Sequence, residues 1–283
     1  SRFAILLVFA FALRLIWALF VPVAPVSDAS AYMTFAQNLV QAGTYGFEPD
    51  TPSCYWPPGT SLIYAAALKV FGSNTLAVVV PNLLSGTLLV ALAYAYAKDR
   101  LGSGVAFLAG VFVALWPTLV QYTTIPASEI HYAVLVLLAL LLVERVGWPF
   151  PVRGLSGGLA AGLGCLVRPT ALLVPLLAAP ALLSREKWPK ALAVVILAFV
   201  GLFVGVLPWT YRNYHAFGKW VLVSANGGAN LWMGNNPHTE GKYMPLPPET
   251  RGMDEAERDK YLGQQGRDHI LSHPRAFLRN VAL

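Results

Sequence analysis

Charged residues are scarce in this chain. Of its 283 residues only 12% are Asp, Glu, Lys or Arg, whereas 56% are hydrophobic. Soluble globular domains average about 25% charged residues, so the composition excludes an ordinary soluble domain. Several apolar runs instead reach the roughly 17–25 residues that a membrane-spanning helix needs. The composition therefore predicts an integral membrane protein that crosses the bilayer several times.

Cysteine is nearly absent, and so are the clustered basic residues typical of nucleic-acid binding. Cys54 and Cys165 are the only two cysteines. They define no disulfide framework, and a bridge between them is the less favoured interpretation. The net charge of +6 fits cytoplasmic loops that face anionic lipid. We therefore expect membrane lipids, and no nucleic acid, among the partners. The first apolar run has no small-residue cleavage site after it, so we interpret it as a retained helix.

Seven spans are predicted from the apolar runs, at residues 3–21, 74–97, 104–122, 129–145, 154–167, 169–184 and 190–209. Basic residues occupy alternate short connections, at Lys98, Arg100, Arg145, Arg153, Arg185, Lys187 and Lys190. The positive-inside rule makes these connections cytoplasmic, which puts loops 22–57 and 123–128 outside. Residues 60–71 are apolar but too short to span, so we expect a helix at the outer interface.

These patterns predict an all-α polytopic membrane protein with amphipathic interfacial helices in its first outer loop. Residues 1–209 form a transmembrane module and residues 210–273 an extracytoplasmic segment. Residues 274–283 open a further span, which suggests a truncated protein.

The first outer loop contains no Lys or Arg, although it carries acids. From Ser27 to Gly43 the pattern is helical, with Ser27 as the expected N-cap and Gly43 as the stop. The apolar stripe consists of Tyr32, Phe35, Ala36, Leu39 and Val40, and Tyr32 is also a candidate substrate-binding residue. Asp28 falls in the first turn, where a carboxylate can simply complement the helix dipole. Because this helix would lie on the membrane, Asp28 is also a candidate for chemistry at the bilayer surface.

A second acid, Glu129, begins the fourth span from the same side of the membrane. An acid is ordinary at a helix N-terminus. Two carboxylates at one face could also act as a base and a metal ligand. His131 is a third candidate metal ligand, although a lone histidine is more often a hydrogen-bonded core residue.

Arg168 is predicted at the outer face, against the charge rule. Two interpretations remain open: a salt bridge or snorkelling side chain, and an anchor for an anionic headgroup or phosphate. Arg14, inside the first span, is expected to be structural.

The rest of the outer sequence offers weaker signals. Tyr55 and Trp56 are either interfacial belt residues or a sugar-stacking surface. Asn226 and Asn230 lie in an Asn-rich segment that either shapes turns or binds sugar hydroxyls. Residues 219–223 predict a short strand. Asp254 and Glu257 resemble a capping box that starts a helix to about Ser272.

Five sequence features, in order, carry a resemblance to a known family. They are Asp28-Ala29-x-x-Tyr32 with Gly43-Thr44-Tyr45-Gly46; Trp56-Pro57-Pro58-Gly59; Ser128-Glu129; Arg168-Pro169-Thr170; and Pro208-Trp209-x-x-Arg212-Asn213-Tyr214 continuing to Asn235-Asn236-Pro237. With these features the chain resembles the polytopic GT-C glycosyltransferases, in the branch related to protein O-mannosyltransferases and lipid A aminoarabinose transferases.

The resemblance implies a GT-C-like helical bundle and a glycosyltransferase that uses a polyprenyl-phosphate-linked sugar. It implies a hexosyl or pentosyl transfer to a lipid, protein or glycan acceptor outside the cytoplasm, in a bacterial inner or plasma membrane. Asp28 then corresponds to the catalytic carboxylate and Glu129 to the second acid. Many relatives have two adjacent acids where this chain has Ser27-Asp28. They differ in metal dependence, so the cofactor stays unknown, with a divalent metal ion as the candidate.

The residues suggest a division of roles, and other functions compete with it. We hypothesise that Asp28 is the base, that Glu129 orients acceptor or metal, and that Arg168 and Arg212 hold the donor phosphate. The alternative is a polytopic lipid or solute transporter or flippase. Transporters usually bind at mid-membrane on broken, repeated helices, whereas these acids lie in outer loops and no repeat is apparent. A nonenzymatic envelope-assembly protein remains a further alternative.

Overall fold

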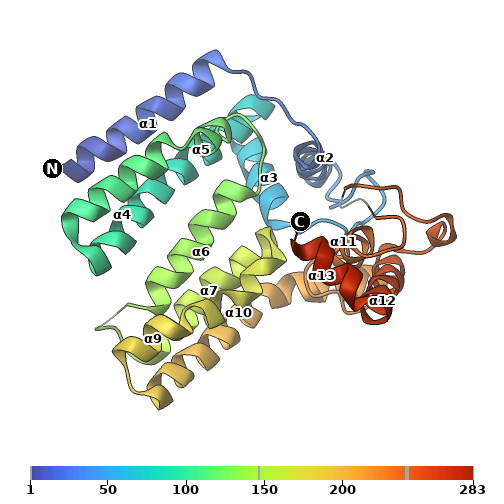
Figure 1. Cartoon of the computed structure of the whole chain (residues 1–283). Coiled ribbons are helices and arrows are strands. Elements are labelled where there is room, and N and C mark those ends of the chain that lie inside the picture. Colours follow the sequence, from blue (N-terminus) through green and yellow to red (C-terminus); the bar gives the residue numbers. More distant parts are fainter. Residues whose placement is uncertain (1, 146, 240–241, 283) are drawn as a thin grey trace. The chain divides into compact units, whose positions relative to one another are not determined.

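The computed structural model describes residues 2–145, 147–239 and 242–282, and these residues form an all-α protein (Figure 1). Ser1 and Leu283, at the ends of the predicted regions, lie outside the described residues. Within the described parts no strand forms, which confirms the predicted fold class. Among the residues that the structure describes, four helices are long and apolar enough to cross a membrane: Arg2–Phe20, Asn74–Leu115, Phe150–Val167 and Trp188–Phe217.

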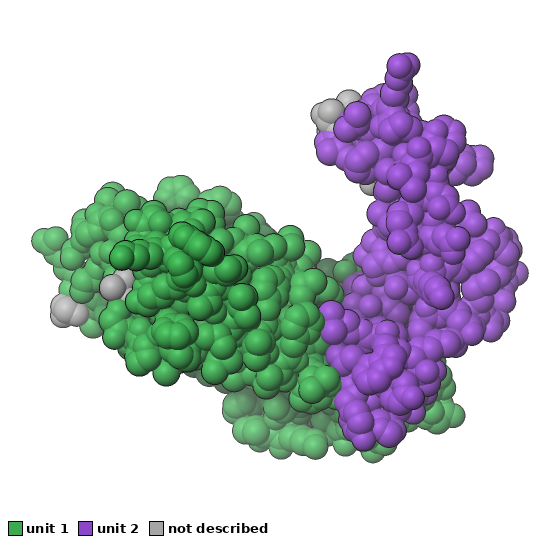
Figure 2. Space-filling model, turned by 90° about the horizontal axis from the view of Figure 1, so that it is seen from below, with its two compact units in different colours: residues 1–52, 57–208 green, residues 53–56, 209–283 purple. Residues whose placement is uncertain are grey.

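The chain divides into two compact units, coloured separately in Figure 2. Unit 1 comprises Ser1–Pro52 and Pro57–Pro208, and unit 2 comprises Ser53–Trp56 and Trp209–Leu283. The helices of unit 1 are α1 Arg2–Phe20, α2 Asp28–Gln41, α3 Gly59–Phe71, α4 Asn74–Leu115, α5 Pro117–Gln121, α6 Glu129–Val143 and α7 Phe150–Val167. They are followed by η1 Pro169–Leu173, α8 Val174–Leu177, α9 Ala179–Arg185 and α10 Trp188–Phe217, which continues into unit 2.

The second predicted span, residues 74–97, lies in the first arm of α4. The third, residues 104–122, is not one helix, because it begins in the second arm of α4, breaks at Trp116 and continues as α5. Gly102, at φ 83°, interrupts the helical backbone and reverses its direction (Figure 1). A positive φ costs glycine little, because it has no Cβ. After the reversal, Gly110 of the second arm lies beside Tyr94 of the first. Helix α1 packs on this hairpin through a cluster of Leu6, Ala10, Val90 and Ala114.

The sixth predicted span, residues 169–184, is not one regular helix. It breaks into η1, α8 and α9, each with a proline in its first turn. Pro169, Pro175 and Pro180 lack the N–H that a continuous helix would donate, so apolar length alone overestimated helical regularity.

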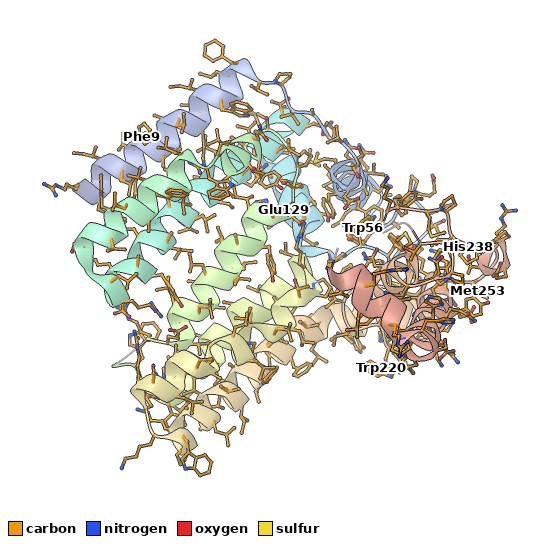
Figure 3. All side chains as sticks on the ribbon, viewed as in Figure 1. Phe9, Trp56, Glu129, Trp220, His238 and Met253 are labelled. Atoms are coloured by element: carbon orange, nitrogen blue, oxygen red, sulfur yellow. The ribbon has the colours of Figure 1, made fainter. Side chains whose placement is uncertain are left out.

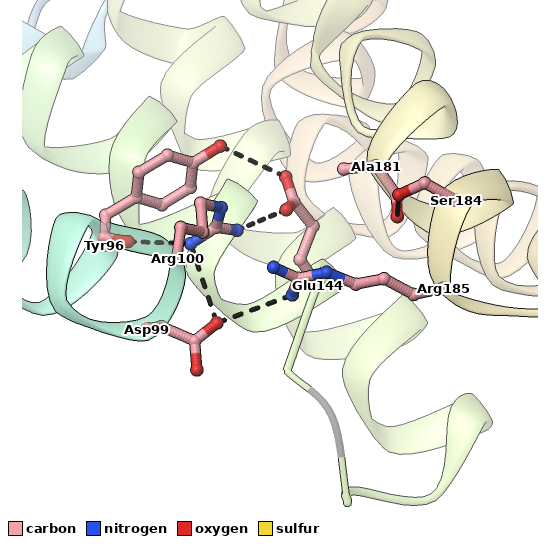
Figure 4. A network of polar contacts seen from close by, with 7 residues as sticks. All are labelled: Tyr96, Asp99, Arg100, Glu144, Ala181, Ser184 and Arg185. Atoms are coloured by element: carbon pink, nitrogen blue, oxygen red, sulfur yellow. Dashed lines mark hydrogen bonds and ion pairs between the residues drawn. The ribbon is translucent and has the colours of Figure 1, made fainter. Parts of the chain in front are cut away.

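One end of unit 1 gathers charges from the connections predicted to be cytoplasmic. Arg100 pairs with Glu144, whose side chain is only 2% exposed, and Asp99 bridges Arg100 and Arg185 (Figure 4). Glu186 pairs with Arg153. Burial alone would raise the pKa of Glu186, but hydrogen bonds from Arg153 and Lys190 outweigh it and lower that pKa. Carboxylates buried at this end are therefore matched by cations.

The other end of unit 1 holds α3 and the loop that precedes α6. The Asn82 amide of α4 donates to the carbonyl oxygens of Tyr122 at 2.7 Å and Ile125 at 2.9 Å. Its own oxygen accepts from the Tyr64 hydroxyl of α3 at 2.9 Å. The predicted short helix at residues 60–71 therefore exists and meets this loop, while its place at a membrane interface stays a prediction.

Unit 2 contains the end of α10, α11 Gly227–Gly234, η2 Pro248–Thr250, α12 Glu255–Ser272 and α13 Pro274–Ala282. The strand predicted at residues 219–223 is wrong. Side chains of α10 hold this segment instead: the hydroxyl of Thr210 donates to Leu222 O and the amide of Asn213 to Val221 O. The predicted cap of α12 is confirmed, because Asp254 Oδ1 accepts from the Glu257 N–H at 2.8 Å. That α13 begins a further span stays a prediction.

Glycines let α7 lie directly against α10 within unit 1. A Cβ on Gly158 would come 2.1 Å from Ala198 O, and one on Gly162 2.4 Å from Leu202 O. Both separations are far below contact distance, so the backbones of the two helices touch. Close approach through small residues is the usual way in which helices associate inside a membrane.

We expect Gly158→Ala to destabilise the protein by about 1–3 kcal/mol, because overpacking forces the two helices apart. Gly104→Ala is the matched control, since a Cβ there meets no atom within 4 Å. Thermal unfolding in detergent, followed by size-exclusion chromatography, measures both variants. Equal melting temperatures for the two variants would contradict the packing described.

Candidate active site

Helix α2 brings Asp28 to one end of unit 1, next to a strained residue. Ser27, at φ 53° and ψ −126°, is the only non-glycine residue with a positive φ in the part of the chain that the structure describes. Such backbone outliers cost free energy and often accompany functional sites. Ser27 occupies the N-cap position, but its predicted capping bond is absent. Its hydroxyl instead lies 3.3 Å from Asp28 Oδ1.

The rest of α2 is anchored firmly, which fixes Asp28 in place. Phe35 is fully buried and packs edge-on against Tyr45, with ring centroids 4.6 Å apart. The Asn38 amide donates to the carbonyl oxygens of Gly46 and Phe47, both at 2.9 Å. The predicted stop is confirmed, since the helix ends at Gln41 and Gly43 takes φ 72°. The turn after α2 therefore folds back and holds the helix.

Asp28 and Glu129 line one open cleft with a volume of about 190 Å³. Its walls come from the start of α2, the loop before α6 and the end of α7: Val26, Ser27, Asp28, Ala29, Tyr32, Tyr122, Ile125, Pro126, Ala127, Ser128, Glu129 and Arg168. Figure 3 labels Glu129 where α6 begins.

Arg168 connects two walls of this cleft. Its guanidinium forms an ion pair with Glu129 Oε1, and its Nε donates to Ser128 Oγ at 2.9 Å. Ser128 Oγ in turn lies 3.4 Å from Glu129 Oε2. The side chains of Arg168 and Glu129 are 41% and 40% exposed, so both remain accessible from the cleft.

Two tyrosines supply neutral polar groups beside these charges. Burial raises the pKa of Tyr32, although a hydrogen bond with Ser128 opposes the shift. Burial also raises the pKa of Tyr122. The negative charge of Glu129 raises it further, whereas the positive charge of Arg168 lowers it. Both phenols therefore stay protonated at neutral pH and can donate hydrogen bonds to a ligand.

The cleft brings together four of the residues singled out from the sequence, namely Asp28, Tyr32, Glu129 and Arg168. The sequence reasoning missed Ser128 and Tyr122 as members of the site. Ser128 had a usable signal, because it directly precedes the predicted second acid. No sequence signal pointed to Tyr122, because this residue joins the cleft beside α2 only through the fold of the loop before α6.

His131 does not line the cleft. It is 3% exposed, its Nδ1 lies 3.0 Å from Ser85 Oγ, and its ring packs edge-on against Tyr64. Among the described residues, no three His, Cys, Asp or Glu side chains form a group that could hold a metal ion. The structure thus does not unite Asp28, Glu129 and His131 as ligands. With Glu129 already paired to Arg168, this donor set does not fit a three-ligand metal site.

Five further predicted residues belong to unit 2 and make contacts there. Arg212 donates to Ser53 O at 2.8 Å, and its guanidinium lies 4.7 Å from the Trp209 ring centroid. Tyr55 and Trp56 pack edge-on at 5.2 Å. Asn226 accepts from the Ser224 hydroxyl at 3.1 Å, and Asn230 is exposed on α11. Their predicted roles in binding phosphate and sugar stay predictions.

Residues 56–211, more than half of the chain, match the family described as dolichyl-phosphate-mannose-protein mannosyltransferase. The chain belongs to this family. It is accordingly an integral membrane glycosyltransferase of the GT-C type, a class that uses lipid-linked sugars. The matched range includes Glu129 and Arg168, whereas Asp28 precedes it. No curated protein and no solved structure matches the chain.

We expect Arg168→Gln to change the free energy of unfolding by less than about 1 kcal/mol, because its ion pair is exposed. The matched comparison is Arg100→Gln, which leaves the Glu144 carboxylate, 2% exposed, without its cation. Breaking a buried pair in this way costs about 3–5 kcal/mol. Denaturation in detergent measures both variants. If Arg168→Gln is as unstable as Arg100→Gln, the Glu129–Arg168 pair is structural rather than functional.

Proposed function

We propose that this glycosyltransferase moves one glycosyl group from a polyprenyl phosphate to an acceptor hydroxyl outside the cytoplasm, with inversion at the anomeric carbon. The observation that carries the proposal is the convergence of Asp28, Glu129 and Arg168 in one cleft. These residues come from three separate elements of unit 1. The cleft lies opposite the charged connections that the positive-inside rule assigns to the cytoplasm.

Arg168 is the proposed ligand of the donor phosphate. Its planar guanidinium can bind two phosphate oxygens at once, which suits it better than lysine to this task. It is 41% exposed toward the cleft, and Ser128 fixes its Nε. Arg212 is proposed as the second phosphate ligand and belongs to unit 2.

Asp28 is the proposed general base. It is exposed, and within the described residues it makes no ion pair, so its carboxylate can accept a proton. In the transfer step the acceptor oxygen bonds to the anomeric carbon while the bond from that carbon to the phosphate oxygen breaks. The phosphate leaves with the electron pair, and the acceptor proton moves to Asp28. This step inverts the anomeric carbon and needs no covalent intermediate.

Glu129 is the proposed partner that holds Arg168 and then yields it to the donor. In the structure the Glu129 carboxylate forms an ion pair with the Arg168 guanidinium, the same group that the donor phosphate would bind. Donor binding would therefore release Glu129 to orient the acceptor hydroxyl. The donor sugar is proposed as a hexose or pentose, and the acceptor as a lipid, protein or glycan hydroxyl. The site is proposed to face outside a bacterial inner membrane.

We expect Asp28→Asn to slow transfer about 100- to 10,000-fold, because the amide cannot accept the acceptor proton. The assay uses the protein in proteoliposomes with radiolabelled polyprenyl-phosphate sugars. Asp50→Asn, an exposed acid of the same outer loop, is the control and should retain full activity. Undiminished turnover in Asp28→Asn would refute the assignment. Lipid movement across the bilayer without cleavage of the sugar phosphate, in both variants, would favour a flippase.

We expect Glu129→Gln to bind polyprenyl phosphate about threefold to fivefold more tightly, while transfer slows. An exposed ion pair is worth up to about 1 kcal/mol, and the amide no longer competes for Arg168. Titration with polyprenyl phosphate measures the affinity separately from turnover. Arg168→Gln is the counterpart and should lose affinity. Weaker phosphate binding by Glu129→Gln would show that Glu129 supports donor binding rather than competing with it.

A further inference from the structure

One face of α12 carries a row of polar side chains that the proposed function does not use. Their spacing is i, i+3, i+4 and i+7, so they share one side of the helix. The row is Gln265, Asp268, His269 and Ser272. Trp232 of α11 and the residues just after this helix, Asn235, Asn236 and Pro237, form the opposite wall of an open cavity of about 250 Å³. The whole cavity lies in unit 2.

Glycines bring the two walls together. A Cβ on Gly228 of α11 would come 1.8 Å from Asp259 O of α12, and one on Gly266 would come 3.1 Å from Leu231. The Gly228 N–H donates to Asp259 Oδ1 at 2.6 Å. The backbones of α11 and α12 are therefore in direct contact, and Trp232 is held in a fixed position relative to the polar row.

The polar groups of this cavity are only partly used by the fold. The Asn235 amide nitrogen donates to Leu231 O at 3.0 Å, which fixes its plane. Within the described residues, the side chains of Gln265 and Asp268 make no hydrogen bond or ion pair, and both are exposed. The neighbouring cavity of unit 2 differs, because Lys219 there pairs with both Asp254 and Glu257. Lys219 and Glu257 of that cavity are thus already paired, whereas Gln265 and Asp268 are left to bind a ligand.

We propose that the cavity between α11 and α12 binds a neutral pyranose unit of a glycan. A pyranose offers adjacent hydroxyls, each both donor and acceptor, and an apolar face of C–H groups. The amide of Gln265 can donate and accept, the carboxylate of Asp268 accepts, and the half-buried ring of Trp232 offers an apolar surface. The described lining contains no Lys or Arg, and His269 is its one basic side chain. A phosphate or an acidic sugar would therefore meet the Asp268 carboxylate with no permanent positive charge to offset the repulsion.

The proposal concerns unit 2 alone and does not depend on the transfer chemistry assigned to Asp28. Its test uses the full chain in nanodiscs, with saturation-transfer difference NMR as the readout. The probes are methyl α-D-mannopyranoside, mannobiose, cellobiose and chitobiose, with N-acetylneuraminic acid as the anionic comparison. We expect at least one neutral probe to bind with a Kd of about 0.1–10 mM.

We expect Gln265→Ala and Asp268→Ala each to weaken this binding about fivefold to tenfold, as the loss of one or two hydrogen bonds predicts. Gln264→Ala is the matched control: it is the adjacent exposed residue of α12, it lies outside the cavity lining, and it should bind normally. Trp220→Ala, at an exposed aromatic stacked on Tyr214, controls for the loss of any surface tryptophan, whereas Trp232→Ala should abolish binding.

Three results would overturn the proposal. The first is the absence of saturation transfer from every neutral probe at about 50 mM. The second is an equal loss of saccharide binding in Gln264→Ala and Gln265→Ala. The third is binding of the anionic probe alone. The Asp28→Asn variant separates the two proposals. It should keep saccharide binding while losing transfer, so failure of one leaves the other standing.

Discussion

The cleft depends on how the backbone of the loop between α5 and α6 satisfies its hydrogen bonds. A non-helical segment at the end of a membrane bundle needs partners for its carbonyls, because apolar surroundings offer none. Asn82 supplies two donors to this loop, at Tyr122 and Ile125. The Trp17 indole N–H donates to the hydroxyl of Thr124, and the Ala24 N–H donates to the Thr124 carbonyl oxygen. Ser128 and Glu129 follow this fixed loop directly, so their position is set before any ligand binds.

Arg14, inside the first span, likewise donates hydrogen bonds to backbone carbonyl oxygens. Pro117 has no N–H, so the Val113 carbonyl four residues earlier loses its helical donor. Arg14 Nη2 lies 3.3 Å from that carbonyl oxygen, and Nη1 lies 3.4 Å from Ala114 O. Gly86 leaves room for the guanidinium, since a Cβ there would come 2.4 Å from Arg14 Nε. A fully buried arginine thus caps the second arm of α4, in keeping with the structural role expected from the sequence.

The sequence was a good guide where one physical signal dominated. Apolar length predicted most of the long helices, and glycine predicted that α2 ends just before Gly43. It failed where local and tertiary effects compete. Prolines interrupt the 169–184 span, and the 219–223 segment bonds to side chains of α10 instead of pairing as a strand. The sequence alone could not decide whether Arg168 pairs with Glu129. The two residues are 39 positions apart and become neighbours only because α6 and α7 pack together.

Exposure, rather than charge, distinguishes the cleft from the opposite end of unit 1. Both ends contain arginine–glutamate pairs, but Glu144 and Arg153 are each 2% exposed whereas Glu129 and Arg168 are about 40% exposed. A buried pair cannot exchange partners without leaving a charge in apolar surroundings. An exposed pair can exchange partners, because water and an incoming anion compensate each charge as it separates. The same residue types therefore fix the bundle at one end and remain accessible from the cleft at the other.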